Sequence, residues 1–185
     1  NKFEEIQIYN KRKLVPFGEF LPFEKILNSF GFKKITEGHG SFIKGKEDKN
    51  LIFGQFNILP LICYEIIFPN LIQKSSVDTN LIVNISEDGW FGKTIGPDQH
   101  FSKSIFRAIE NNTFVLRSAN KGTSAIIDNK GNLLKEMNRN EAGNIEFEVP
   151  LIKSNKIKND LIFFILLFTY LLFFLIFKET NNAKQ

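Results

Sequence analysis

Short apolar runs alternate with amphipathic segments through the middle of the chain. "FNILPLIC" and "TNLIVNIS" are apolar runs that end in polar residues, a pattern typical of buried strands. Between them, "EIIFPNLIQKSSVD" carries Ile66, Leu71 and Ile72 at helical spacing, with Pro69 interrupting near the start. This order predicts two strands joined by a helical connection.

The segment "GPDQHFSKSIFRAIENN" predicts a longer helix after the second strand. Pro97 and Asp98 suit its first turn. The expected buried face consists of Phe101, Ile105, Ala108 and Ile109.

Three further segments, "TFVLRSAN", "GTSAIIDNKGNLLKEM" and "NIEFEVP", predict strands, the middle one a hairpin that turns on residues 129–131. Strand-helix-strand-helix followed by antiparallel strands predicts a layered α/β domain, such as an α-β-β-α arrangement.

The first fifty residues are mixed. The alternation of Ile6 and Ile8 is typical of a strand end, and a Pro/Gly loop follows. From Phe23 to Phe30 the pattern becomes amphipathic and predicts a short helix. "TEGHGSFIKGKEDKN" predicts a Gly- and charge-rich turn between strands.

The segment 161–177 contains no charge, Gly or Pro. As a helix it would extend roughly 26 Å, slightly less than the ~30 Å hydrocarbon core of a bilayer. A buried core helix is the alternative, but the complete apolar ring favours a membrane span. We therefore predict a folded domain at 1–152, a linker at 153–160, a transmembrane helix at 161–177 and a polar tail at 178–185.

The composition of the chain limits which classes of protein it can belong to. The chain has 185 residues, enough for one domain, and a net charge of +4. Its lysines are scattered, so we expect a membrane surface rather than nucleic acid as partner. The single cysteine excludes an internal disulfide, and two distant histidines argue against a zinc site. Because the chain opens without Met or an apolar signal core, we expect a fragment of a longer protein.

The single cysteine, Cys63, lies in "LPLICYEIIFP", where a predicted strand gives way to a helix. Such a position lifts a side chain onto the rim of a sheet, where a helix N-terminus favours negative charge. A thiol there is either a nucleophile or a small hydrophobic core residue, and this stretch alone leaves both interpretations open.

Two other segments favour the nucleophile. A lysine such as Lys11 beside a thiolate would stabilise the thiolate, and it could also stabilise an oxyanion during acyl transfer. Glu19 follows Lys11 beyond a Pro-Phe-Gly loop. The loop "NISEDGWFGKTIGPDQH" gathers Trp90, Phe91 and three glycines after a strand, which favours a binding lid over a linker. Alternatively, Lys11 and Glu19 are solvated loop charges and Trp90 is a core residue.

Four segments then resemble a known family. They are "YNKRKLVPFGEFLP", "ICYE", "WFGKTIGPDQH" and "FRAIENNTFVLRSANKG", in the family's order. Together they resemble the nitrilase superfamily, and in particular its membrane branch, the apolipoprotein N-acyltransferases. The resemblance covers about Tyr9 to Asn132, and the C-terminal apolar segment agrees with it.

The resemblance implies a fold, an activity and a location. The fold is α/β, the C-terminal part of a nitrilase-like α-β-β-α sandwich followed by one transmembrane helix. A Glu-Lys-Cys triad, without metal or cofactor, takes an acyl chain from a phospholipid as a thioester. It passes the chain to the amino group of a diacylglyceryl-cysteine at the N-terminus of an apolipoprotein. The family belongs to the bacterial inner membrane, as multi-pass proteins with the catalytic domain facing the periplasm.

The same resemblance assigns roles to residues. Cys63 is the nucleophile and Lys11 the catalytic lysine that helps to hold the oxyanion. The supporting and substrate-binding residues are Glu19, Phe17, Tyr64, Glu65, Trp90 and Phe91. His100 and Asp98 are expected to be structural, and Glu65 also suits the first turn of a helix.

The departures from the family pattern matter. The family's general base lies on an earlier strand, and Glu4 and Glu5 are too near Lys11 to supply it. The chain alone is therefore expected to be inactive. The loop reads Glu87-Asp88-Gly89 where the family commonly has Asn-Asp-Ala, and "SANKGTS" replaces a Thr-Asn-Thr-Gly type of sequence.

Three further points stay open. Lysines flanking 161–177 weakly favour a cytoplasmic domain, against the family's periplasmic one, and we give precedence to the motifs. The alternative enzyme is a membrane-tethered amidohydrolase in which water resolves the thioester. A truncated, inactive remnant is the non-catalytic alternative.

Overall fold

The computed structural model describes residues 6–31, 42–46, 49–73, 79–152 and 160–182. The chain forms two compact units, Asn1–Asn155 and Lys156–Gln185. The predicted turn at residues 36–50 lies largely outside the described residues.

The first unit contains a six-stranded sheet whose order follows the sequence. The strands are β1 (Leu51–Phe53), β2 (Phe56–Ile62), β3 (Leu81–Glu87), β4 (Phe114–Asn120), β5 (Ser124–Ile127) and β6 (Leu133–Met137). The central strands β2, β3 and β4 are parallel, and the outer pairs are antiparallel. The structure thereby confirms both predicted buried strands and the hairpin that turns at residues 129–131.

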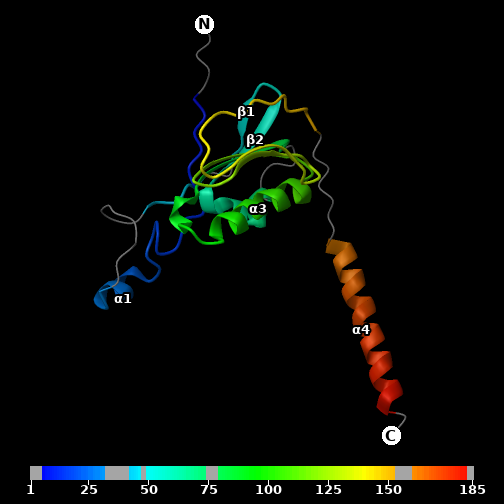
Figure 1. The fold of residues 1–185 in the computed structure, drawn as a ribbon. Coiled ribbons are helices and arrows are strands. Elements are labelled where there is room, and N and C mark those ends of the chain that lie inside the picture. Colours follow the sequence, from blue (N-terminus) through cyan, green and yellow to red (C-terminus); the bar gives the residue numbers. More distant parts are fainter. Residues whose placement is uncertain (1–5, 32–41, 47–48, 74–78, 153–159, 183–185) are drawn as a thin grey trace. The chain divides into compact units, whose positions relative to one another are not determined.

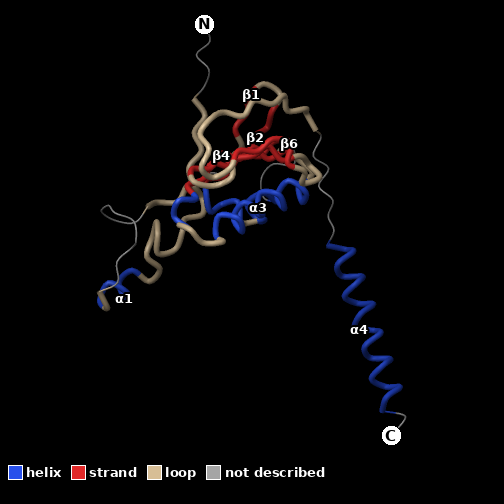
Figure 2. The backbone as a smooth tube through the Cα atoms, viewed as in Figure 1, coloured by secondary structure: helices blue, strands red, loops and turns tan. Residues whose placement is uncertain are grey.

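Helices join the parallel strands. They are η1 (Cys63–Ile67) and α2 (Pro69–Gln73) after β2, and η2 (Asp88–Phe91) and α3 (Gly96–Asn111) after β3. In Figures 1 and 2, α3 lies along one face of the sheet. Parallel strands need such crossovers. Side chains from both connections enter the same apolar core, so both connections pack on this face. The apolar core there consists of Leu59, Leu61, Ile66, Leu71, Ile72, Ile82, Ala108, Val115, Ala125 and Ile127.

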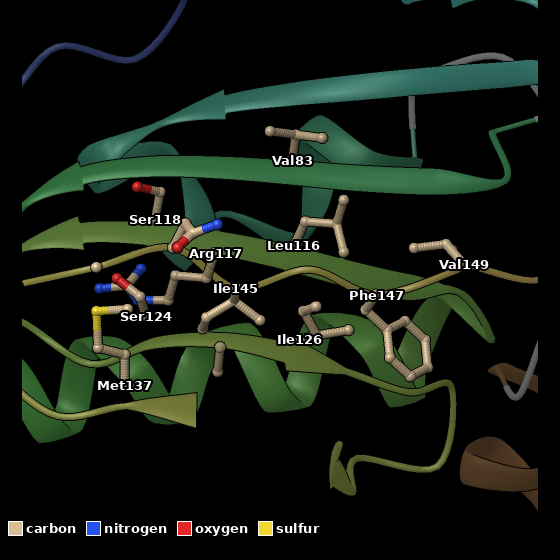
Figure 3. A pocket seen from close by; sticks show the side chains of 13 residues that line it. Val83, Leu116, Arg117, Ser118, Ser124, Ile126, Met137, Ile145, Phe147 and Val149 are labelled. Atoms are coloured by element: carbon tan, nitrogen blue, oxygen red, sulfur yellow. The ribbon is translucent and has the colours of Figure 1, made fainter. Parts of the chain in front are cut away.

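The opposite face of the sheet is covered by residues 143–152. Leu81, Phe114 and Ile126 form its buried centre, against which Ile145 and Val149 pack. A pocket of about 320 Å³ remains between this segment and strands β3 to β6 (Figure 3). The structure thus has one sheet with two differently covered faces.

Two predicted strands are wrong, and each has a physical reason. "NIEFEVP" alternates because Ile145 and Val149 point onto the sheet, while residues 141–150 form no ladder. Ile6 and Ile8 are exposed and form no strand either. Instead, the Gln7 side chain accepts from the Ile52 amide and donates to its carbonyl at the edge of β1.

The predicted helices are found close to their expected positions. α1 (Glu24–Ser29) occupies the amphipathic stretch, and α3 carries Pro97 and Asp98 in its first turn. Its predicted face is wrong in one member, because Ile109 is 48% exposed. The buried side of α3 is mostly polar instead, formed by Pro97, His100, Ser104, Arg107, Ala108 and Asn111.

The second unit contains one helix, α4 (Asp160–Asn182). Its large apolar side chains between Ile162 and Phe177 are exposed. None of the helices within the described residues combines the length and apolar character that a membrane crossing requires. The predicted transmembrane helix at 161–177 therefore stays a prediction.

Candidate functional site

Cys63 lies where β2 ends and η1 begins, as its sequence position predicted. Its backbone φ is 52°, in the left-handed region that residues with a Cβ rarely adopt. Such strain persists only where the surroundings impose it, and it is concentrated at functional sites. One expectation changes: η1 is a five-residue 3-10 turn, too short to provide the helix dipole expected beside the thiol.

Cys63 lines a mostly apolar pocket of about 580 Å³. Five of the predicted site residues meet in it: Glu19, Cys63, Tyr64, Trp90 and Phe91. The sequence analysis missed Val15, Pro16, Gly18, Phe42 and Glu87, which also line the pocket. Phe17 is not part of its lining and is 48% exposed, with a φ of 61° at the turn between Pro16 and Gly18.

Glu65, two residues after Cys63, is fully buried and accepts four hydrogen bonds. Oε1 accepts from the backbone N–H groups of Arg12, at 2.5 Å, and Lys13, at 3.0 Å. Oε2 accepts from the Tyr9 hydroxyl at 2.9 Å and from the Ile62 amide at 2.8 Å. Four donors suit the lone pairs of an ionised carboxylate. Glu65 therefore ties the Tyr9–Lys13 segment to the strand end before Cys63.

Burial raises the pKa of Tyr9, and the negative charge of Glu65 raises it further. The hydroxyl therefore remains protonated and donates to Glu65, while it accepts from Arg12 Nε at 3.1 Å. These hydrogen bonds fix the position of the Tyr9–Lys13 segment, which carries Lys11.

Lys11 and Glu19 form a half-buried ion pair, with Nζ 2.6 Å from Oε1. Glu19 Oε2 accepts from the Val15 amide at 2.9 Å, which closes the loop between the two residues. The amides of Arg12 and Lys13, directly after Lys11, are the ones bound to Glu65. Lys11 is thus held from both sides, and its partner Glu19 lines the pocket that Cys63 enters.

A buried polar cluster lies below the cysteine. His100 Nε2 is 3.2 Å from the carbonyl oxygen of Cys63, and Nδ1 is 2.9 Å from Asp88 Oδ1. Arg117 Nη2 donates to Asp88 Oδ2 at 2.6 Å, and its Nη1 donates to Asn84. Ser86 adds a hydrogen bond to Asp88 at 2.7 Å. The cluster joins η2, α3, β3 and β4 directly beneath the turn at Cys63.

The charges in this cluster are coupled. Burial alone would raise the pKa of Asp88, but the hydrogen bond to His100 and the charge of Arg117 outweigh it and lower the pKa to about 2. Burial lowers the pKa of Arg117, which Asp88 opposes. Asp88 is therefore ionised at neutral pH.

The sequence analysis assigned His100 a structural place and gave Asp88 and Arg117 no role. One signal was available in the sequence: polar residues at 100, 104, 107 and 111 recur at helical spacing on α3. That stripe predicts a buried polar face, but it does not reveal which strands supply the partners.

Asp98, expected in the first turn of a helix, is found there and pairs with Arg139 on the surface. Among the described residues, no three His, Cys, Asp or Glu side chains are grouped so that they could hold a metal ion.

Comparisons with known proteins identify the family of this chain. The carbon–nitrogen hydrolase family model matches residues 1–158. A protein of Rickettsia typhi named apolipoprotein N-acyltransferase is 43% identical over 145 residues, which cover 77% of this chain and 28% of that protein. One of the same name from Rhizobium leguminosarum is 42% identical over 76% of this chain and 26% of its own. The chain thus spans about a quarter of these relatives.

Among solved structures, a carbon–nitrogen hydrolase from Helicobacter pylori matches with a TM-score of 0.50 at 13% identity. The match covers 60% of this chain and 45% of that one. At this identity the likeness concerns the fold alone, and it supports the predicted nitrilase-like α/β architecture.

Proposed function

This chain belongs to the carbon–nitrogen hydrolase family, and we propose that it acts in apolipoprotein N-acyl transfer. In the proposed reaction, Cys63 carries an acyl chain between a phospholipid and a lipoprotein. The observation that supports this most directly is the placement of Cys63: a thiol on a left-handed turn, opening into an apolar pocket beside the Lys11–Glu19 pair. The names of the relatives supply the class of substrate.

The first half-reaction is attack of the Cys63 thiolate on the ester carbonyl of the phospholipid. The carbon–sulfur bond forms, the ester carbon–oxygen bond breaks, and the lysophospholipid alkoxide takes a proton as it leaves. In the second half-reaction, the neutral α-amine of a diacylglyceryl-cysteine attacks the thioester. The amide forms, the thiolate leaves, and the amine loses one proton. Two such steps predict ping-pong kinetics.

Lys11 is the proposed electrostatic partner of the tetrahedral intermediates. Its ammonium group is held at 2.6 Å by Glu19, and the backbone that follows it is fixed by Glu65. A positioned charge needs no reorganisation as the oxyanion develops. Glu19 and Glu65 are thus proposed positioning residues, each acting through Lys11 or its backbone.

The proposed reaction also needs a general base that takes the proton of the Cys63 thiol. Glu19 and Glu65 both accept several hydrogen bonds, so neither is available to take the thiol proton. We propose that a further carboxylate is required and that the chain alone does not catalyse transfer. This predicts that joining the chain to the regions found in its longer relatives restores activity.

The pocket lining suits an acyl chain. Val15, Pro16, Phe42, Trp90 and Phe91 supply apolar contact, and Tyr64 lies beside the cysteine. Trp90 is 63% exposed, as expected of an aromatic side chain at the mouth of a lipid site.

We further propose that α4 anchors the protein in the bacterial inner membrane, with the catalytic unit on the periplasmic side. The exposed apolar side chains from Ile162 to Phe177 support contact with lipid. Anchoring avoids extraction of a lipid into water, which would cost about 0.8 kcal/mol per CH₂.

Intact mass spectrometry tests the proposal. The protein, extended by the regions of its relatives and purified in detergent, is incubated with phospholipid alone. We expect a mass gain of one acyl chain, absent in Cys63→Ser. Release of that chain to a diacylglyceryl peptide, and not to water, supports the acyltransferase. Release to water would favour an amidohydrolase, and no mass gain in a folded sample would refute the nucleophile.

A further inference from the structure

The Asp88–His100–Arg117 cluster contains charge that the proposed reaction does not use. Asp88, His100 and Arg117 are at most 4% exposed. Burying ionised groups is unfavourable unless they are paired and hydrogen-bonded. A cluster of this kind therefore needs an explanation beyond stability.

The contacts of the His100 ring indicate which ring nitrogen donates a hydrogen bond. Nδ1 lies 2.9 Å from Asp88 Oδ1, an oxygen of an ionised carboxylate that can only accept. Nε2 lies 3.2 Å from the Cys63 carbonyl oxygen, which also can only accept. The contact through Nε2 is attractive only when Nε2 carries a hydrogen, whereas Nδ1 faces both the Asp88 acceptor and the donor Arg117 Nη2, which lies 3.3 Å away.

The contact with Cys63 falls at a strained point of the backbone. With φ at 52°, Cys63 adopts a conformation that disfavours side chains with a Cβ. A hydrogen bond to its carbonyl fixes the peptide plane that follows, and hence the direction of the thiol. Glu65 holds the preceding side of the turn through the Ile62 amide at 2.8 Å. Together, His100 and Glu65 fix the turn on either side of Cys63.

The cluster itself is closely confined. Arg117 bridges Asp88 and Asn84, and Phe91 packs against the His100 ring with centroids 5.4 Å apart. Gly122 passes so close to Asp88 that a Cβ there would collide with the carboxylate. Phe91 also lines the pocket that Cys63 enters, so the cluster contacts the pocket through this side chain.

We propose that Asp88, His100 and Arg117 form a positioning unit that holds the nucleophile. His100 contacts Asp88 through Nδ1 and donates from Nε2 to the Cys63 carbonyl, and thereby keeps the thiol directed into the pocket. Arg117 and Ser86 orient Asp88. The assignment of Cys63 as nucleophile rests on the proposed function; the positioning of its side chain does not.

The experiment measures the rate at which iodoacetamide alkylates Cys63 in the full chain, by mass spectrometry. His100→Gln is compared with wild type at a temperature where both are fully folded. We expect a 10- to 100-fold change in rate, because small misplacements of a reacting group have effects of this size. Arg117→Lys, which keeps the charge, should retain more of the wild-type rate than Arg117→Met.

The matched control is Arg107→Gln. Arg107 is also a buried polar residue of α3, but it pairs with Glu110 on the same helix. It should lower stability without altering the alkylation rate. Equal rates in folded His100→Gln and wild type would overturn the proposal.

A measurement on the wild-type chain covers the case in which the variants do not fold. Nitrogen-15 NMR of the His100 ring should show a proton on Nε2, and a ring that carries no proton there would refute the proposed bond to the Cys63 carbonyl. Neither measurement involves phospholipid. Failure of acyl transfer with these results intact would therefore count against the proposed function alone.

Discussion

The two sides of Cys63 are built in opposite ways. The side toward the pocket is apolar and open, with Trp90 63% exposed at its mouth. The side toward the sheet is charged and closed, with Asp88, His100 and Arg117 almost completely buried. A single short element, η2, contributes to both, since Asp88 and Trp90 are two residues apart. The sheet side of Cys63 is therefore rigid, whereas the pocket side can accommodate ligands of different length.

The largest expected effect comes from breaking the closed side. Asp88→Asn removes the carboxylate charge that pairs with Arg117, which leaves a buried guanidinium uncompensated. We expect the free energy of unfolding to fall by about 3–5 kcal/mol, measured by thermal or denaturant unfolding in detergent.

Asp98→Asn provides its control, because Asp98 pairs with Arg139 at the surface. Loss of that exposed pair should cost no more than about 1 kcal/mol. Similar losses in the two variants would show that the buried cluster contributes no more than a surface pair.

The next effect concerns Glu65, which ties the Tyr9–Lys13 segment to the Ile62 amide just before Cys63. Glu65→Gln places an amide N–H₂ group against backbone donors, so at least one of the four hydrogen bonds is lost. Hydrogen bonds to a charged group contribute roughly 1.5–3 kcal/mol, and we expect a loss in that range. Alkylation of Cys63 should change with it, whereas Glu19→Gln should lower stability less, because Glu19 is only half-buried. A Glu65→Gln variant with unchanged stability and an unchanged alkylation rate would contradict the proposed positioning role of Glu65.

Acid provides a third way to weaken the closed side. The pKa of Asp88 is lowered from 3.8 to about 2 in the folded protein. Its stabilisation is therefore fully present above pH about 4 and is lost as the pH falls through about 2. A shift of this size corresponds to about 2 kcal/mol. Unfolding measured between pH 5 and 2 should show a shallower decline in Asp88→Asn, and parallel curves would refute the assignment.

The smallest effect on stability is expected on the open side. Trp90→Ala removes a largely exposed ring, so the free energy of unfolding should change by less than about 0.5 kcal/mol. In the protein extended by the regions of its relatives, contact between Trp90 and the acyl chain predicts that Trp90→Ala raises the KM for long-chain phospholipid and leaves that for a short-chain ester the same. A loss of stability near that of Asp88→Asn would instead make Trp90 a core residue.

The sequence by itself determined much of the local structure. Apolar runs of strand length identified β2 and β3, and helical spacing identified α3, because these patterns follow from the periods of strand and helix. The same reasoning placed Cys63 at the end of a strand. It failed at "NIEFEVP", since an alternating segment packed on a sheet has the same pattern as a strand within one.

Tertiary structure alone decided which distant residues meet. Glu65 binds amides 53 and 52 residues away, and Arg117 reaches Asp88 across 29 residues. Those contacts depend on strand order and on which face α3 covers, and neither is encoded in a local period. The buried polar cluster was missed for this reason: its members are polar and ordinary in sequence, and their burial follows only from the elements that enclose them.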